Sequence, residues 1–244
     1  MKPLFLKLSL LFLLAITISS CQFNIGGNGV NAEGEIVEKE FKIDKTFDKV
    51  STGSAWDVEL IKSDETRLMV RTNENIIPLF EYKINGGELS ISSKGNIRNP
   101  DVMDVELYYK SLSEIHASSA SDVTSKEVFE QRDITISSSS AADIILRLKT
   151  KNCNVSASSA SDIELSGTSI NFNANASSSA DIDAENLKTK NSTVKASSAA
   201  SIDVYATESL TAKTSSSGSI DYSGNPKTTD FDQSTSGGDI EKND

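Results

Sequence analysis

Hydrophobic and polar residues alternate strictly over long stretches of the second half of this chain. From Ile170 to Ala184 every even position is apolar or small, and every odd position is Asn, Ser or Asp. The same alternation returns in residues 155–165 and 210–220. A period of two is the signature of a β-strand that buries one face, so this half of the chain is predicted to consist of strands.

One phrase recurs within these strands: Ala-Ser-Ser-Ala-Ser-Asp followed by Val or Ile. It stands at residues 117–123 and 157–163, and a variant stands at 176–182. The residues that close the copies are spaced by 21, 19, 19, 20, 18 and 20 positions. They are Val123, Ile144, Ile163, Ile182, Ile202, Ile220 and Ile240. A regular period of this length predicts one coil of a solenoid per repeat.

The predicted fold class is therefore all-β: a right-handed parallel β-helix, or a closely related β-solenoid, with about 20 residues per coil. Leucine-rich repeats have a similar length. However, the L-x-x-L-x-L-x-x-N pattern is absent, and no helical periodicity separates the copies.

Alternation also places one set of serines on the inward side of each coil, where a thin solenoid would bend and leave room only for small side chains. Stacked at the strand spacing of roughly 4.8 Å, their hydroxyls could bond to one another or to the neighbouring backbone. We therefore expect serine ladders along the axis. Their members would be Ser119, Ser138, Ser140, Ser159, Ser178, Ser198 and Ser216.

The first half of the folded body is less regular. Residues 36–112 keep the strand character but with longer and more varied loops, and we interpret them as an N-terminal β-rich cap and first coils. A cap is expected because exposed parallel strand edges invite aggregation. Residues 113–244 are predicted to form the regular Ser-rich coils.

The beginning of the chain carries a targeting signal. Lys2 and Lys7 precede an apolar run, and residues 1–20 end in two serines before Cys21. This pattern is typical of a lipoprotein signal peptide that is too short to span a membrane, after which Cys21 is acylated. Ordinary secretion with a free cysteine is the alternative. The Gly- and Asn-rich residues 21–35 are predicted to be a flexible tether.

Charge and cysteine content narrow the range of partners. Without Lys2 and Lys7 the chain has 22 Lys and Arg against 35 Asp and Glu, a net charge of −13. Nucleic acid is therefore not expected as a partner. Once Cys21 carries lipid, Cys153 is the only thiol, which excludes an internal disulfide and a cysteine-based zinc site. Its place in the alternation predicts a buried structural thiol.

An aspartate precedes the closing Val or Ile in most copies, and stacked coils would bring these carboxylates into one outward row. Ser201 and Ser219 hold the position in two copies. The row could bind a divalent cation or a glycan, or it could be a set of turn residues that keep the edge soluble. The candidate residues are Asp57, Asp122, Asp143, Asp162, Asp181 and Asp239.

Catalytic candidates are few. His116 is the only histidine, it faces outward by the alternation, and no G-x-S-x-G motif accompanies the many serines. Parallel β-helices also include lyases and glycosidases that use acid pairs along a groove, often with aromatic residues that stack on sugars. The aromatic candidates are Trp56, Tyr108, Tyr109, Tyr205 and Tyr222.

Several motifs together resemble those of a known family. They are Phe47-Asp-Lys-Val50, the predicted hairpin at residues 85–91, the segment Ile115–Val123, and the repeats that follow it. Over about residues 40 to 240 the arrangement is similar to that of the bacterial putative auto-transporter adhesin, head GIN domain family. The resemblance implies an exported or lipid-anchored β-solenoid and suggests adhesion by analogy. It brings no catalytic residues with it.

We therefore expect a lipid-anchored cell-envelope protein, held at the outer membrane, with an adhesin-like binding or scaffolding role and neither catalysis nor a cofactor. The expected partners are the membrane, through the lipid, and a glycan or a surface protein. A polysaccharide-active enzyme, either a lyase or a glycosidase, is the alternative. End-to-end stacking of coils into homo-oligomers is a third hypothesis.

Overall fold

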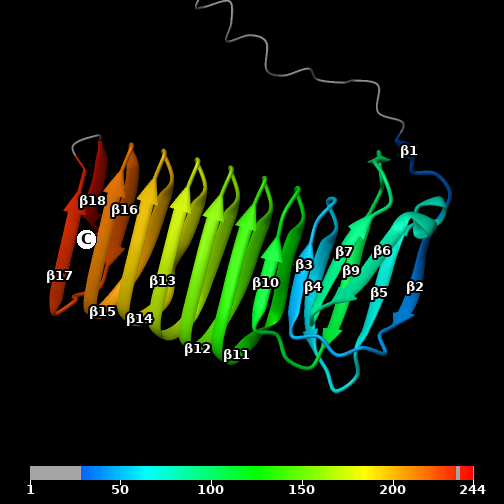
Figure 1. Ribbon diagram of the computed structural model, residues 1–244, viewed down its shortest axis with the longest axis horizontal. Coiled ribbons are helices and arrows are strands. Elements are labelled where there is room, and N and C mark those ends of the chain that lie inside the picture. The colour runs from blue at the N-terminus through cyan, green and yellow to red at the C-terminus, as the bar shows by residue number, and fades with distance from the viewer. Residues whose placement is uncertain (1–28, 235–236, 244) are drawn as a thin grey trace, which may run out of the picture.

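The computed structural model describes residues 29–234 and 237–243, and within them the chain is a parallel β-solenoid of about seven turns with about 19 residues per turn (Figure 1). The prediction of an all-β solenoid is confirmed. The signal peptide and Cys21, predicted from the sequence, lie outside the described residues. Within the described part no helix is long and apolar enough to cross a membrane.

The strands fall into two groups. Those of the N-terminal region are β1 (Val30–Asn31), β2 (Ile36–Lys42), β3 (Lys49–Thr52), β4 (Asp57–Lys62), β5 (Arg67–Asn73), β6 (Phe80–Asn85), β7 (Glu88–Ser93), β8 (Ile97–Arg98), β9 (Met103–Tyr109) and β10 (Glu114–Ala117). Those of the regular coils are β11 (Asp122–Ser139), β12 (Asp143–Ser158), β13 (Asp162–Ser177), β14 (Asp181–Ser197), β15 (Ser201–Ser215), β16 (Gly218–Ser223), β17 (Thr228–Gln233) and β18 (Gly238–Lys242).

Each long strand of the regular coils bends once and contributes to two walls of the solenoid. In β12, residues 143–149 lie in the first wall and residues 152–158 in the second. In the first wall β4 and β9 precede β11, and β16 and β18 follow β15. In the second wall β7, β3 and β10 precede β11, and β17 follows β15. We call the bend the corner of the coil.

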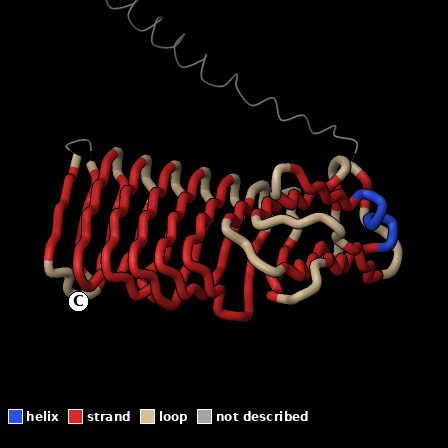
Figure 2. The backbone as a smooth tube through the Cα atoms, turned by 60° about the horizontal axis from the view of Figure 1, so that its bottom comes forward, coloured by secondary structure: helices blue, strands red, loops and turns tan. Residues whose placement is uncertain are grey.

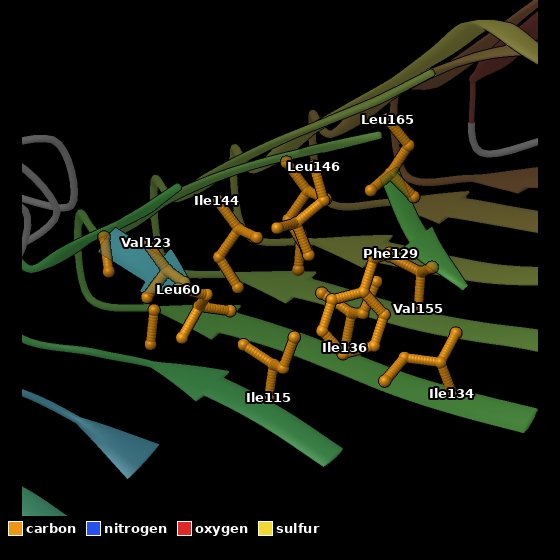
Figure 3. Close-up of a cluster of buried hydrophobic side chains, with 14 of the residues drawn as sticks. Leu60, Ile115, Val123, Phe129, Ile134, Ile136, Ile144, Leu146, Val155 and Leu165 are labelled. Atoms are coloured by element: carbon orange, nitrogen blue, oxygen red, sulfur yellow. The ribbon is translucent and has the colours of Figure 1, made fainter. Parts of the chain in front are cut away.

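The register confirms the repeat period read from the sequence. Parallel pairing joins Val123 to Ile144, Ile144 to Ile163, and so on through Ile240, so that each closing residue stacks on the one before it. These residues are buried up to Ile220, and the packed side chains of successive coils form one continuous core between the walls (Figure 3). Each buried aliphatic side chain contributes about 1.5–3 kcal/mol.

The serine ladders predicted from alternation are not formed. Of the seven serines only Ser138 is buried, and the other six are exposed. The exposed serines and the residue after each have positive φ values, for example 59° at Ser159 and 56° at Ala160. Two consecutive residues in the left-handed region turn the chain sharply, so the serines lie in the turn that links the second wall to the next coil.

A backbone ladder holds these turns together. The amide of Ala141 donates to the carbonyl of Ser159 at 3.1 Å, and the amide of Ala160 donates to that of Ser178 at 3.1 Å. Equivalent bonds link the turns from Ala55 to Ser217. The buried serines beside the turns satisfy remaining backbone groups, as when Ser138 donates to the carbonyl of Ala142 at 2.6 Å. Small residues are thus required by turn geometry and not by stacking of hydroxyls.

A side-chain ladder does exist, but it is made of asparagines at the corner. Asn171 Nδ2 donates to Asn152 Oδ1 at 2.7 Å, and Asn191 Nδ2 donates to Asn171 Oδ1 at 3.1 Å. Ser209 extends the row by donating to Asn191 at 2.9 Å. Identical amides at the strand spacing can each donate and accept, which is the arrangement seen in stacked polar zippers.

The two ends of the solenoid differ. At the N-terminal end β2 and β6 run antiparallel to their neighbours, and the 3₁₀ helix η1 (Glu74–Leu79), drawn blue in Figure 2, buries Ile76 in the core. Trp56 is fully buried there and packs edge-on against Phe80 at 5.0 Å. These elements cover the N-terminal end of the solenoid.

The folded body begins earlier than the sequence suggested. β1 pairs with β8, and the amide of Val30 donates to the carbonyl of Asn96 at 2.9 Å, so part of the expected tether of residues 21–35 belongs to the cap. At the other end β17 is exposed along its whole length, and Phe231 is 41% exposed. No described element covers the C-terminal end.

Candidate binding surfaces

The outer face of the first wall carries two parallel rows of acidic residues near the Ser-rich turns. Asp122, Asp143, Asp162 and Asp181 are direct neighbours in successive strands, followed by Ser201, Ser219 and Asp239. We call this line the first acidic row. The structure therefore places the predicted aspartates together, with Asp57 beside Asp122 on the next strand, β4.

Sequence reasoning missed two parts of this surface. Asp104 pairs with Asp57 and extends the first row into the cap, although its strand lacks the serine phrase that marked the others. Two residues further along each strand is a second acidic row, interrupted only at Thr124 and Ile145. Its members are Glu106, Glu59, Glu164, Asp183, Asp203, Asp221 and Glu241. Counting residues two positions after each aspartate would have found it.

Crowding and burial disfavour the charged form of several of these carboxyls. Burial, together with the charges of Asp143 and Asp181, raises the pKa of Asp162. Burial and the neighbouring Asp221 and Asp183 raise the pKa of Asp203 to about 6. At the strand spacing two carboxylates repel by about 0.9 kcal/mol in water, so the rows are tolerable on a wet surface but favour a cationic or proton-donating partner.

A hollow of about 330 Å³ lies where the acidic rows meet the cap. Arg71 enters it and forms an ion pair with Asp104 at 2.5 Å, while Met69 contributes apolar surface. The pKa of Asp57 is raised by burial and by the charges of Asp122 and Asp104. The carboxylates around the hollow are those of Glu38, Asp57, Glu59, Asp104, Glu106 and Asp122.

The interactions around the hollow suit a ligand that donates hydrogen bonds. Lys126 Nζ pairs with Glu59 at 2.7 Å, and the Tyr108 hydroxyl donates to Glu106 at 2.8 Å. Asp57 and Asp122 form no salt bridge with any described residue. Across residues 29–234 and 237–243, no group of three or more His, Cys, Asp or Glu side chains has a geometry that could hold a metal ion. Cation binding by the row stays a prediction.

The outer face of the second wall is neutral and polar. Its outward residues in the middle coils are Asn, Ser and Thr, and Asn173 Nδ2 donates to Asn154 Oδ1 at 3.0 Å between strands. Near the C-terminal end this face has an open depression of about 600 Å³ where Lys195 and Lys213 lie on adjacent strands. Lys213 is paired with Asp232 at 3.2 Å.

The family model described as putative auto-transporter adhesin, head GIN domain, matches residues 46–226. The chain belongs to this family. Its residues 46–226 include most of the cap and all but the last coil, so the resemblance inferred from Phe47–Val50 and the Ser-rich repeats is confirmed.

Solved structures with the same fold are described as putative adhesins and as a putative lipid binding protein. A putative adhesin from Bacteroides fragilis is 22% identical, with a TM-score of 0.82, and the match covers 88% of this chain and 100% of that one. A putative lipid binding protein from Parabacteroides distasonis is 22% identical, with a TM-score of 0.74 and coverage of 88% and 99%. These identities establish the fold alone. A search of the curated proteins finds no match.

Of the other sequence candidates, Tyr108 contacts Glu106 at the hollow, whereas His116, Trp56, Tyr109 and Cys153 do not line it. His116 Nδ1 lies 2.7 Å from Ser137 Oγ on the second wall, and the Ser-rich turn separates it from the acidic rows on the first wall. Trp56 and Tyr109 are buried and cannot stack on a sugar. Arg67 covers the ring of Tyr108 at 3.7 Å. Cys153 is buried, as expected, and burial raises the pKa of its thiol to about 12.

Proposed function

We propose that this chain is an adhesin-like binding module of the cell envelope, anchored through a lipid on Cys21 and without chemistry of its own. Membership of a family described as adhesins supports a role at the cell surface. The observation that carries the proposal is the placement of the two ends. The described chain starts at the capped N-terminal end, and the regular coils extend away from it (Figure 1).

An anchor at Cys21 would fix the orientation of the solenoid. Gly29, where the described chain begins, is only eight positions after Cys21, and an extended chain of that length spans at most about 29 Å. The cap would therefore stay near the membrane surface, and seven coils at about 4.8 Å each would extend the solenoid by about 34 Å. Both long outer faces would be accessible to a partner.

The hollow on the first wall is the binding site that we propose for an extracellular glycan or the basic side chain of a surface protein. Carboxylates accept hydrogen bonds from sugar hydroxyls or from cationic groups, and Met69 offers apolar contact to a sugar ring or an aliphatic stem. A polysaccharide-active enzyme is the weaker alternative, because two of the aromatic residues that could form sugar subsites are buried in the core.

A binding screen run in parallel with a cleavage assay tests this proposal. The full chain is applied to an array of glycans and surface peptides, and the same glycans are assayed for new reducing or unsaturated ends. We expect binding without cleavage, and loss of binding in the double variant Asp57→Asn and Asp122→Asn. Asp221→Asn and Asp239→Asn, which remove two charges of the acidic rows away from the hollow, form the matched control. Cleavage would support the enzyme instead.

The anchor is tested separately. The mass of the mature protein extracted from membranes should show residues 1–20 removed and acyl groups on Cys21, and Cys21→Ser should release the protein from the membrane fraction. A mature protein with an unmodified Cys21 thiol would contradict the lipid anchor but would leave the binding role untouched.

A further inference from the structure

The outer face of the first wall is divided by charge across its width in the coils of β11 to β14. The acidic rows lie beside the Ser-rich turns, and basic residues lie at the opposite margin of the same face. Lys149 and Lys188 stand just before the corner, and Arg132, Lys151 and Lys190 stand on it. In the strand register, Lys149 lies beside Glu130 of β11 and Thr168 of β13, and Lys188 lies on the other side of Thr168. We call these five cations the basic rows.

Most of these charges are unpaired within the chain. Among the described residues, Lys151, Lys188 and Lys190 form no salt bridge, and neither do the aspartates of β11 to β14 in the first acidic row. Lys149 pairs with Glu130 at 3.1 Å, but both side chains are more than half exposed. Arg132 Nε lies 3.6 Å from Asp133 Oδ2, a long distance for an ion pair, and the Arg132 side chain is 76% exposed. Both margins of the face are thus available to an external partner.

The same face also exposes apolar side chains. Val128 is 39% exposed, Ile145 is 49% exposed, and Ile170, on the corner between Lys151 and Lys190, is 41% exposed. These are three of the six large hydrophobic residues exposed in the described part of the chain. The second wall differs, because its Asn side chains bond to one another between strands. The first wall is therefore the face that lacks partners.

We infer that this face is a self-association surface, on which a second copy of the chain packs about a two-fold axis parallel to the solenoid axis. Such an axis keeps each coil at the same height in both copies and exchanges the two margins of the face. The acid of a coil then meets the base of the same coil in the other copy: Asp122 with Arg132, Asp143 with Lys151, and Asp181 with Lys190.

A second copy fits this face better than an anionic polymer does. A polyanion would neutralise the basic rows, but the acidic rows would either face solvent or repel the polyanion. The two-fold arrangement satisfies both margins at once, and the acid and base rows have the same strand spacing because they belong to the same coils. It also brings Val128 of the two copies together near the axis, and Arg147, the neighbour of Val128 on β12, meets its own counterpart there, which weakens the contact.

The size of the face predicts a weak dimer. From the first acidic row to the corner there are eight residues, about 26 Å, and four coils give a height of roughly 19 Å. The face is therefore about 500 Å² per copy, below the roughly 800 Å² of a standard interface. The net charge of −13 repels distant copies, but salt near 0.1 M screens that repulsion beyond about 10 Å while sparing contact pairs. If the proposed anchors on Cys21 are present, they lie at the same end of such a dimer.

Zero-length cross-linking of the full chain in detergent tests the geometry directly. A carbodiimide joins a carboxylate to an amine only when they are in contact. Asp143 and Lys151 of one chain are eight residues apart along a β-strand, about 26 Å, so a peptide linking them must come from two copies. We expect this cross-link at about 0.1 M salt and its loss at about 1 M. Its absence at low salt would overturn the proposal.

A charge swap separates this pairing from other kinds of association. One variant carries Asp143→Lys and Asp181→Lys, and the other carries Lys151→Asp and Lys190→Asp. Each alone should lose the dimer seen by sedimentation velocity, because like charges then face each other. A mixture of the two should regain it, because every contact again joins opposite charges. The matched controls change Ser156 and Thr193, exposed on the second wall, to Lys or to Asp, and should dimerise like the wild type.

The other outcomes each contradict the proposal. If only the basic-row variant changes behaviour and mixing does not restore pairing, the basic rows bind an anionic polymer instead. If a dimer persists in both variants but is lost in Phe231→Asp, the chains associate end to end through the exposed C-terminal coil. Binding to glycans is measured independently, so failure of the dimer would leave the proposed binding role standing.

Discussion

The left-handed turn pairs predict that the same substitution will have opposite effects three residues apart. Ser159 and Ser156 are both exposed and lie in the same coil, but Ser159 has a φ of +59° whereas Ser156 is in the extended strand β12. Replacing either serine with glycine removes the same atoms and gives the unfolded chain the same additional freedom. The two variants therefore differ in the backbone conformation of the folded state.

The expected magnitudes follow from that difference. A non-glycine residue in the left-handed region costs about 1–2 kcal/mol, which Ser159→Gly relieves. Glycine in an ordinary strand position costs about 0.5–1 kcal/mol, which applies to both variants. Ser159→Gly should therefore be neutral or stabilising by up to about 1.5 kcal/mol, and Ser156→Gly should be destabilising by about 0.5–1 kcal/mol. The gap between them is about 1–2 kcal/mol.

Thermal unfolding followed by circular dichroism measures this gap. Repeat arrays can depart from two-state unfolding, so the melting temperatures of the variants are compared directly. For a chain of this size the gap corresponds to about 2–8 °C. If Ser159→Gly lowers the melting temperature as much as Ser156→Gly does, the turn is not left-handed in solution and the account of the Ser-rich phrase is wrong.

Three further predictions concern single contacts and a titrating group. Gly167→Ala should destabilise the fold by about 1–3 kcal/mol in thermal melts, because the added Cβ would lie 2.1 Å from the carbonyl oxygen of Leu148. The control, Gly95→Ala, has a similar φ but open space around it and should cost about 1 kcal/mol. Asn171→Ala removes two hydrogen bonds of the ladder, and Asn173→Ala removes one hydrogen bond between strands. Chemical denaturation should therefore show the larger loss of unfolding free energy, about 1–3 kcal/mol, for Asn171→Ala, and equal losses would contradict the ladder. Because the pKa of Asp203 is raised from 3.8 to about 6, its protonated form stabilises the fold at low pH and that stabilisation is lost as the pH rises through about 6. Asp203→Asn should therefore raise the melting temperature near pH 7.5 and have no such effect near pH 4, and a gain that is the same at both would refute the assignment.

The failure of the serine prediction has a specific structural cause. The prediction assumes one continuous strand through residues 155–165, in which Ala157, Ser159 and Ser161 point to the same side. The left-handed pair at Ser159 and Ala160 inserts two residues, so the inward parity is the same before and after the turn. The pattern therefore gave no sign of the interruption. The seven residues between Val155 and Ile163, none of them large or β-branched, were the available signal.

The candidate site was likewise predictable only in part. The aspartates of the first row could be aligned from the repeat period, because the period fixes which residues stack. The hollow could not be predicted, because Arg71 and Met69 come from β5, which runs antiparallel within the cap and belongs to no repeat. The asparagine ladder was also missed, because Asn152 and Asn171 stand at the corner, where alternation does not say which way a side chain points.

The sequence by itself determined the class of fold, the length of the coil and the order of stacking, because hydrophobic alternation and the spacing of Val123, Ile144 and their successors depend only on what each strand must bury. Only the tertiary structure decided where each coil turns and what its outer surface presents. The turn depends on two backbone angles that any small residue can adopt. The hollow depends on Arg71 and Met69 of the antiparallel strand β5, which the repeat period does not place beside the acidic rows.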